Sequence, residues 1–259
     1  TWEFVKDFPM LDGKRYDDPT GKYYVGDEQA LLKAFWKNRD PRFNRACLYN
    51  GREWPVAGRS ADNRMYNALG VSNADDQYGV NPNAGVNAAN NDIFSGMYNY
   101  KVSDLSLTQD KVMTFDIDYI LMRFAEVMFI YAEAANENGH SDVAIDLLKQ
   151  IRKRAGIPGY GETVNLPKPT TTEEVMELIR KEKRIELSFE NCRYFDVRRW
   201  GLVNEYFNKA IHGMNVNYDG NEFFKRTEIV KRIFDRQYFF PIPQGEIDID
   251  KNLVQNTGF

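Results

Sequence analysis

Hydrophobic positions in the second half of the chain recur with the spacing of amphipathic helices. Residues 119–138 are apolar on nearly every side except for a polar stripe, and Gly139 supplies a left-handed stop. Ser141 is a suitable N-cap for the next helix, whose predicted inward face consists of Val143, Ala144, Leu147, Leu148 and Ile151. Gly156 then ends that helix. The pattern therefore predicts an antiparallel helical hairpin over residues 119–155, about the ~34 residues of one tetratricopeptide repeat.

Further local signals predict the elements that follow this hairpin. Thr171 and Glu174 have capping-box spacing, which indicates a helix over residues 172–191, with a second helical segment through Trp200. Farther on, the pair Asp219-Gly220 indicates a β-hairpin turn. One helical hairpin cannot bury its apolar face alone, because repeat proteins need about three stacked units. We expect it to pack on a loop-rich body, on the following helices or on further repeats.

The helix predicted from residue 172 carries charge where an apolar stripe is expected. Glu182, Glu186, Glu190 and Arg193 recur with helical spacing. In one interpretation Glu186 and Glu190, about 5–6 Å apart on one face, are the catalytic carboxylates of a glycosidase. A general acid needs a raised pKa, however, and neighbouring arginines hold carboxylates ionised. The sequence therefore favours a structural ion-pair network, with Arg184 or Arg193 as the expected partner.

Residues 55–100 differ from the rest of the chain because they have no regular apolar period. They are rich in asparagine, and their tyrosines argue against simple disorder. Aromatic rings can stack on the apolar face of a sugar, while amide, carboxylate and guanidinium groups bond its hydroxyls. The candidate ligand-binding residues are Trp54, Asn63, Arg64, Tyr66, Asp75 and Tyr78. In the alternative interpretation, the asparagines form turns and the tyrosines cover the segment's own small core.

Composition narrows the remaining function classes. The 259 residues are 42% hydrophobic and 28% charged, and the net charge of -4 leaves no basic footprint for nucleic acid. No apolar stretch is long enough to span a membrane. Cys47 and Cys192 lack metal-ligand spacing and are expected to be free thiols, and neither His140 nor His212 lies in a triad motif. We predict no catalytic residue, no metal and no cofactor.

Several ordered motifs resemble those of the SusD/RagB family. In the second half of the chain they are residues 123–127 (RFAEV), 131–134 (YAEA), 151–156 (IRKRAG), 182–200, 241–244 (PIPQ) and 255–259 (QNTGF). Upstream, residues 8–14 (FPMLDGK), 38–42 (NRDPR) and Asn50-Gly51 followed by Trp54 occur in the family's order. The chain departs from the family pattern at Thr257, where a proline is usual.

The resemblance implies a mainly α, α+β fold, in which a tetratricopeptide-like hairpin packs on a loop-rich body with short strands. Family members are about twice this length. We therefore expect residues 1–259 to form their C-terminal domain, with the N-terminal repeat-containing half absent from this chain. The resemblance also implies a lipoprotein on the outer-membrane surface that captures oligosaccharide or polysaccharide for a SusC-like TonB-dependent transporter. A glycosidase and a helical scaffold that binds protein or peptide are the alternatives.

Overall fold

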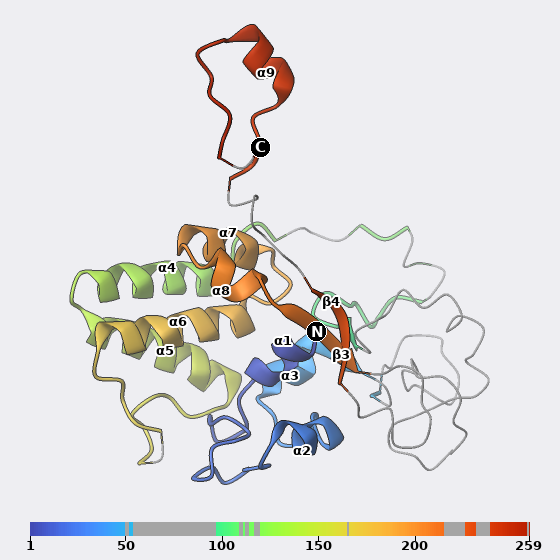
Figure 1. Ribbon diagram of the computed structural model, residues 1–259. Coiled ribbons are helices and arrows are strands. Elements are labelled where there is room, and N and C mark those ends of the chain that lie inside the picture. The colour runs from blue at the N-terminus through green and yellow to red at the C-terminus, as the bar shows by residue number, and fades with distance from the viewer. Residues whose placement is uncertain are drawn as a thin grey trace.

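The computed structural model describes residues 1–49, 52–53, 97–108, 111, 114–116, 120–164, 166–214, 226–231, 239–257 and 259. The helices in these ranges are α1 (Trp2–Asp7), α2 (Glu28–Lys33), α3 (Pro41–Ala46), α4 (Phe124–Glu137), α5 (Ser141–Ala155), α6 (Thr172–Glu186), α7 (Cys192–Arg199), α8 (Val203–Phe207) and α9 (Gln244–Ile249). The strands are β1 (Cys47–Tyr49), β2 (Met97–Asn99), β3 (Ala210–Met214) and β4 (Arg226–Lys231). The expected mainly helical fold with a few short strands is confirmed (Figure 1).

Helices α4, α5 and α6 pack side by side as one layer of the molecule (Figure 1). The first two form the predicted antiparallel hairpin, and α6 covers it. Their shared core is built from Ala125, Phe129, Ala132, Ala144, Ile145, Leu148, Ile151, Val175 and Ile179. The apolar face of the hairpin is thus buried in part by a following helix, which is one of the arrangements that the sequence predicts.

Two details of the predicted hairpin are wrong. Helix α4 begins at Phe124 rather than near residue 119, because residues 120–123 are not helical and Arg123, the residue before the helix, is extended. On α5, Val143 is 37% exposed and Ile145 is buried instead. Helix α5 contacts both α4 and α6. Its buried side chains therefore face two helices rather than one.

The helix ends match the capping signals closely. Gly139 and Gly156 adopt left-handed conformations, with φ of 80° and 84°. The capping box before α6 is complete, since Thr171 accepts from the Glu174 amide and the Glu174 side chain accepts from the Thr171 amide. Ser141 is the first residue of α5 instead of its N-cap, and its hydroxyl donates to Asn136 at 2.7 Å. The structure therefore confirms where these helices begin and end, but not the predicted cap at Ser141.

Residues within 1–49 form an aromatic core between α1, α2 and α3. Phe8, Phe35 and Phe43 are almost fully buried and meet edge to face, with ring centroids 5.5 Å apart for Phe8 and Phe43. Arg39, 2% exposed, donates to the backbone carbonyls of Phe35 and Phe8, both at 2.8 Å. Asp40 caps α3 by accepting from the Arg42 amide at 2.8 Å. The motif at residues 38–42 thus stabilises the junction of α1 and α3.

The four strands form two antiparallel pairs. β1 pairs with β2, and β3 pairs with β4 from Ala210 opposite Lys231 to Met214 opposite Arg226. The turn predicted at Asp219-Gly220 lies outside the described residues, between the two strands that it would join. Near the C-terminus, Gln255 donates to and accepts from the backbone of Ile242 at 2.9 and 2.8 Å. This closes the loop that carries α9, which stands apart from the body in Figure 1.

Candidate functional site

Glu182 of α6 is the centre of a buried charged cluster. Its carboxylate accepts from Arg42 at 2.9 Å, from the Tyr160 hydroxyl at 3.0 Å and from Arg152. Arg152 is itself 1% exposed and donates to the Gly13 carbonyl at 3.0 Å. Because these residues come from α3, α5, α6 and two loops, the cluster joins the N-terminal body to the helical layer.

Glu186 and Glu190 are also held in ion pairs. Their basic partners come from four separate segments of the chain and are Arg42, Lys101, Arg123 and Arg154. Arg123 binds both carboxylates, with 3.0 Å to Glu186 Oε1 and 2.7 Å to Glu190 Oε2. Only 4% of the Glu186 side chain is exposed. The predicted pairing with basic residues is therefore confirmed for both acids.

The predicted partners of these acids are wrong. Arg184 instead pairs with Asp7 of α1, and Arg193 lies over the ring of Tyr206 at 4.3 Å. The actual partners are far from the acids in sequence, which is why helical spacing could not find them. Two of them, Arg42 and Arg123, do lie in motifs that carry the family resemblance.

The helix that carries these acids is also shorter than predicted. It ends at Glu186 rather than near Asn191, so Glu190 and Arg193 do not continue its face. The turn that follows contains two left-handed residues, Phe189 (φ 62°) and Asn191 (φ 63°). Asparagine tolerates this conformation, so Asn191 was the one sequence signal that the helix ends here. A left-handed phenylalanine is an outlier, so Phe189 gave no such signal.

The pKa values of two acids in the charged cluster are lowered, and one of these acids, Glu190, is a candidate catalytic carboxylate. Burial raises the pKa of Glu182, but Arg42 and Arg152 outweigh it and hold that pKa below 4.5. Burial likewise raises the pKa of Glu190, and its hydrogen bonds with Arg123 and Lys101 outweigh the effect and lower that pKa overall. A general acid of a glycosidase needs the opposite shift. The geometry thus fits a structural role for these acids.

A second charged cluster joins α6 to α4 and α7. Lys183, 5% exposed at its side chain, lies 2.8 Å from Asp196 and 3.5 Å from Glu133. Arg199 pairs with the same two acids at 2.9 and 2.7 Å, and the Trp200 indole donates to Glu133 at 3.3 Å. The dense charges of residues 182–200 therefore bind helices to one another.

The turn after α6 borders an aromatic cavity of about 600 Å³. Its lining includes aromatic rings from α1, the turn, α7 and α8, which are Phe4, Phe189, Tyr194, Phe195, Trp200 and Phe207. Lys183, Arg184 and Arg193 also line it, with Asp196 as the acid of the lining. A cavity of this size and composition is typical of small-molecule sites.

Comparison with known proteins identifies the family. The sequence profile of the SusD family matches residues 1–259. This chain belongs to the SusD family. In two regions, the family motifs are parts of the charged clusters just described, at residues 38–42 and 182–200.

Several SusD-like relatives are similar to parts or all of this chain. SusD-like protein P2 of Formosa agariphila is 33% identical over 142 residues, which is 54% of this chain and 25% of that protein. The crystal structure of a SusD-like protein from Bacteroides fragilis is 26% identical with a TM-score of 0.75, covering 100% of this chain and 46% of that one. A SusD-like carbohydrate binding protein, also from Bacteroides fragilis, shares the fold at 23% identity and a TM-score of 0.59, over 97% and 47%. The chain therefore spans less than half the length of each of these relatives.

All six candidate ligand-binding residues lie outside the residues that the structure describes. They are Trp54, Asn63, Arg64, Tyr66, Asp75 and Tyr78. The structure does show how the segment that contains them is anchored, because Tyr49 at the end of β1 pairs with Met97 at the start of β2. The two ends of this segment of the SusD-family chain thus lie side by side, and the assignment of ligand-binding residues stays a prediction.

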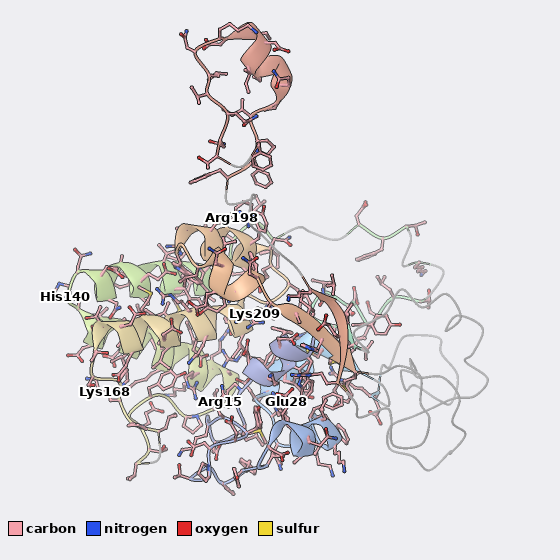
Figure 2. The ribbon with its side chains drawn as sticks, in the orientation of Figure 1. Arg15, Glu28, His140, Lys168, Arg198 and Lys209 are labelled. Atoms are coloured by element: carbon pink, nitrogen blue, oxygen red, sulfur yellow. The ribbon has the colours of Figure 1, made fainter. Side chains whose placement is uncertain are left out.

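The remaining sequence expectations concern thiols, histidines and metals. Cys47 is a buried free thiol, and Cys192 is a partly buried one. His212 lies 2.6 Å from Glu3 through Nδ1, and His140 is exposed at the outer end of the α4–α5 hairpin (Figure 2). The described ranges contain no group of three or more His, Cys, Asp or Glu residues that could hold a metal ion. They also contain no helix long and apolar enough to cross a membrane.

Proposed function

We propose that this chain is the glycan-capturing portion of a cell-surface protein of the outer membrane. It binds oligosaccharide or polysaccharide and delivers oligosaccharides to a SusC-like TonB-dependent transporter, while other enzymes cut the glycan. The observation that carries the proposal is the match of the SusD family over residues 1–259. It is supported by the related SusD-like structure from Bacteroides fragilis that is described as a carbohydrate binding protein.

The proposed capture site is the segment between β1 and β2. Its sequence combines aromatic residues with amides, an acid and an arginine, which are the groups that stack on sugar rings and bond their hydroxyls. The antiparallel pairing of β1 and β2 holds both ends of the segment on the folded body. Loops on a rigid scaffold are where binding residues concentrate.

The proposed function is non-catalytic. Glu186 and Glu190 are the carboxylates that a glycosidase would use, and both are engaged by arginine or lysine. The pKa of Glu190 is lowered by its hydrogen bonds with Arg123 and Lys101, and a carboxylate held ionised in this way cannot protonate a leaving group at neutral pH. This supports binding without hydrolysis.

The exposed face of α4 is a second surface that this function can use. Phe124 is 77% exposed, Tyr131 56% and Ile130 48%. Such a contiguous apolar face on one helix marks a protein contact. We propose that it meets either the transporter or the further helical repeats found in longer family members. The face also favours the second candidate, a helical scaffold that binds protein or peptide.

A glycan-array screen of the chain followed by titration calorimetry tests the capture site. Replacement of Trp54, Tyr66 or Tyr78 by alanine is expected to weaken binding of the identified glycan by about 1–3 kcal/mol for at least one of the three. Tyr131→Ala, which removes an exposed tyrosine from α4, is the matched control and should bind normally. Unchanged affinity in all three variants would place the site elsewhere, and the absence of any glycan binding would favour the scaffold.

The transporter partnership needs a separate measurement. Co-purification of the chain with the SusC-like transporter from detergent-solubilised outer membranes is expected. Loss of that complex in Ile130→Ser, with glycan binding retained, would place the contact on α4.

A further inference from the structure

Two arginines meet where the aromatic cavity joins a second cavity. The second cavity measures about 420 Å³ and is bordered by α1, α6, α7 and the start of β3. Arg184, Arg193 and Phe207 line both cavities. The two cavities are therefore adjacent, and together they form a recess with an aromatic end and a charged end that share Arg184 and Arg193.

At the charged end, both acids are already engaged by other residues, while at least one arginine has no acidic partner among the described residues. Arg184 is paired with Asp7, and the other acid of that lining, Glu3, accepts from the His212 amide at 3.1 Å and contacts its Nδ1. Arg193 has no carboxylate within 4.0 Å among the described residues, and its nearest ring is that of Tyr206. Burial, and after it the neighbouring Arg184, lower the pKa of Arg193 to about 10. Two adjacent guanidinium groups, of which only Arg184 has an acid partner, are stabilised by an added anion.

Lys209 adds a third positive charge to the same end. It follows α8, where Figure 2 labels it, and lines the second cavity. Its ammonium lies 5.6 Å from the centre of the Tyr206 ring, and no ion pair joins it to an acid of the described ranges. Arg193 and Lys209 therefore approach one tyrosine as two cations without a paired acid.

The aromatic end offers rings at its surface instead of burying them. Phe189 is 44% exposed and Phe195 is 67% exposed. Phe189 is also held in a left-handed conformation, and its ring meets that of Phe4 edge to face at 5.5 Å. Strained residues of this kind persist where the surrounding structure holds them and are frequent at binding sites.

A buried polar group is left open in the same lining. Ser188 is 8% exposed, and its hydroxyl has no hydrogen-bond partner among the residues that the structure describes. An unpaired buried hydroxyl is unfavourable by itself and is satisfied when a ligand or water supplies a partner. The recess thus holds aromatic faces, this hydroxyl and two cations, Arg193 and Lys209, that have no carboxylate partner in the described part of the chain.

We propose that this recess binds an acidic sugar, with a carboxylate or sulfate group on Arg184 and Arg193 and the sugar ring against the aromatic residues. This rests on the proposed glycan-capturing function and adds a ligand class to it. A guanidinium group forms two parallel hydrogen bonds with a carboxylate or sulfate. The C–H face of a pyranose ring packs on aromatic rings, as at other sugar sites. A neutral sugar would leave Arg193 without an acidic partner, because Asp7 is paired with Arg184.

Calorimetric titration of the 259-residue chain with three small probes tests the proposal. The probes are methyl β-glucuronide, methyl glucoside 6-sulfate and neutral methyl β-glucoside. We expect both acidic probes to bind at least about tenfold more tightly than the neutral one, as for a charged hydrogen-bonded pair. Comparison of the two acidic probes shows whether the site prefers a carboxylate or a sulfate group. Equal affinity for all three probes would overturn the proposal.

Variants locate the effect in the recess. Arg193→Gln should reduce the affinity for the acidic probes about tenfold or more and leave that for the neutral probe unchanged, while Arg193→Lys should retain part of it. Arg45→Gln, which removes an exposed arginine from α3 with no partner among the described residues, is the charge-matched control. If Arg193→Gln does not fold, Lys209→Gln at the exposed edge serves in its place, with a smaller loss. Unchanged acidic-probe affinity in the folded variants refutes the site.

The experiments distinguish failure of this inference from failure of the proposed capture function. Binding of neutral glycans on the array, with no preference for acidic probes, removes this inference and leaves the proposed capture function in place. Failure of every glycan on the array removes the capture function itself.

Discussion

Glu182→Gln should destabilise the folded chain strongly, because it removes one charge from a buried cluster of three. The Glu182 carboxylate accepts from Arg42 at 2.9 Å, from Tyr160 at 3.0 Å and from Arg152. Glutamine keeps one oxygen acceptor but places an NH₂ group against a guanidinium donor. At least one arginine then loses its carboxylate.

The size of the expected loss in unfolding free energy follows from how deeply the two arginines are buried. The Arg152 side chain is 1% exposed and cannot turn to solvent, while that of Arg42 is 11% exposed and keeps Asp40 as a partner. Breaking a buried ion pair by removal of one partner is unfavourable by about 3–5 kcal/mol. For a domain of this size that lowers the melting temperature by about 6–20 °C.

Chemical denaturation monitored by circular dichroism, with thermal melts in parallel, measures the effect. Glu173→Gln is the matched control, since it is the same change on the same helix at a side chain that is 75% exposed, and it should stay within about 0.5 kcal/mol of the wild type. A loss below about 1 kcal/mol for Glu182→Gln would refute the view that this cluster holds the two halves of the described fold together.

Three further expectations can be checked. The pKa values of Glu182 and Glu190 are lowered on folding, so their stabilisation is complete above pH 4.5 and is lost as pH falls through the lowered values; a flat free energy of unfolding from pH 6 to 3 would contradict this. Burial raises the pKa of Cys47 to about 12 and that of Cys192 to about 11, so a thiol reagent at pH 8 should react slowly until denaturant exposes both; rapid labelling of Cys47 in the folded chain would be inconsistent with it. The apolar face of α4 should bind a hydrophobic dye or drive association, and Tyr131→Ser should reduce either effect, whereas a monomer that binds no dye in sedimentation and fluorescence measurements would exclude it.

Local sequence determined the elements whose signals are local. The capping box at Thr171 and Glu174 and the left-handed glycines at 139 and 156 act within one turn of the chain, so they could be identified without neighbours. The end of α6 was missed because the left-handed Phe189 has no local preference for that conformation. In the folded chain its ring meets that of Phe4, near the N-terminus, which is a contact that the local sequence does not reveal.

The charged clusters show what only the tertiary structure decided. Density of charge in residues 182–200 predicted ion pairs, and the acids are indeed paired. Spacing along one helix pointed to Arg184 or Arg193, yet Glu186 meets Arg42, 144 residues away, and Arg123, 63 residues away. Helical spacing reports only neighbours three or four positions apart. Which distant arginine reaches a buried acid depends on how helices pack, because the unfavourable desolvation of a charge is offset only where a partner arrives in three dimensions.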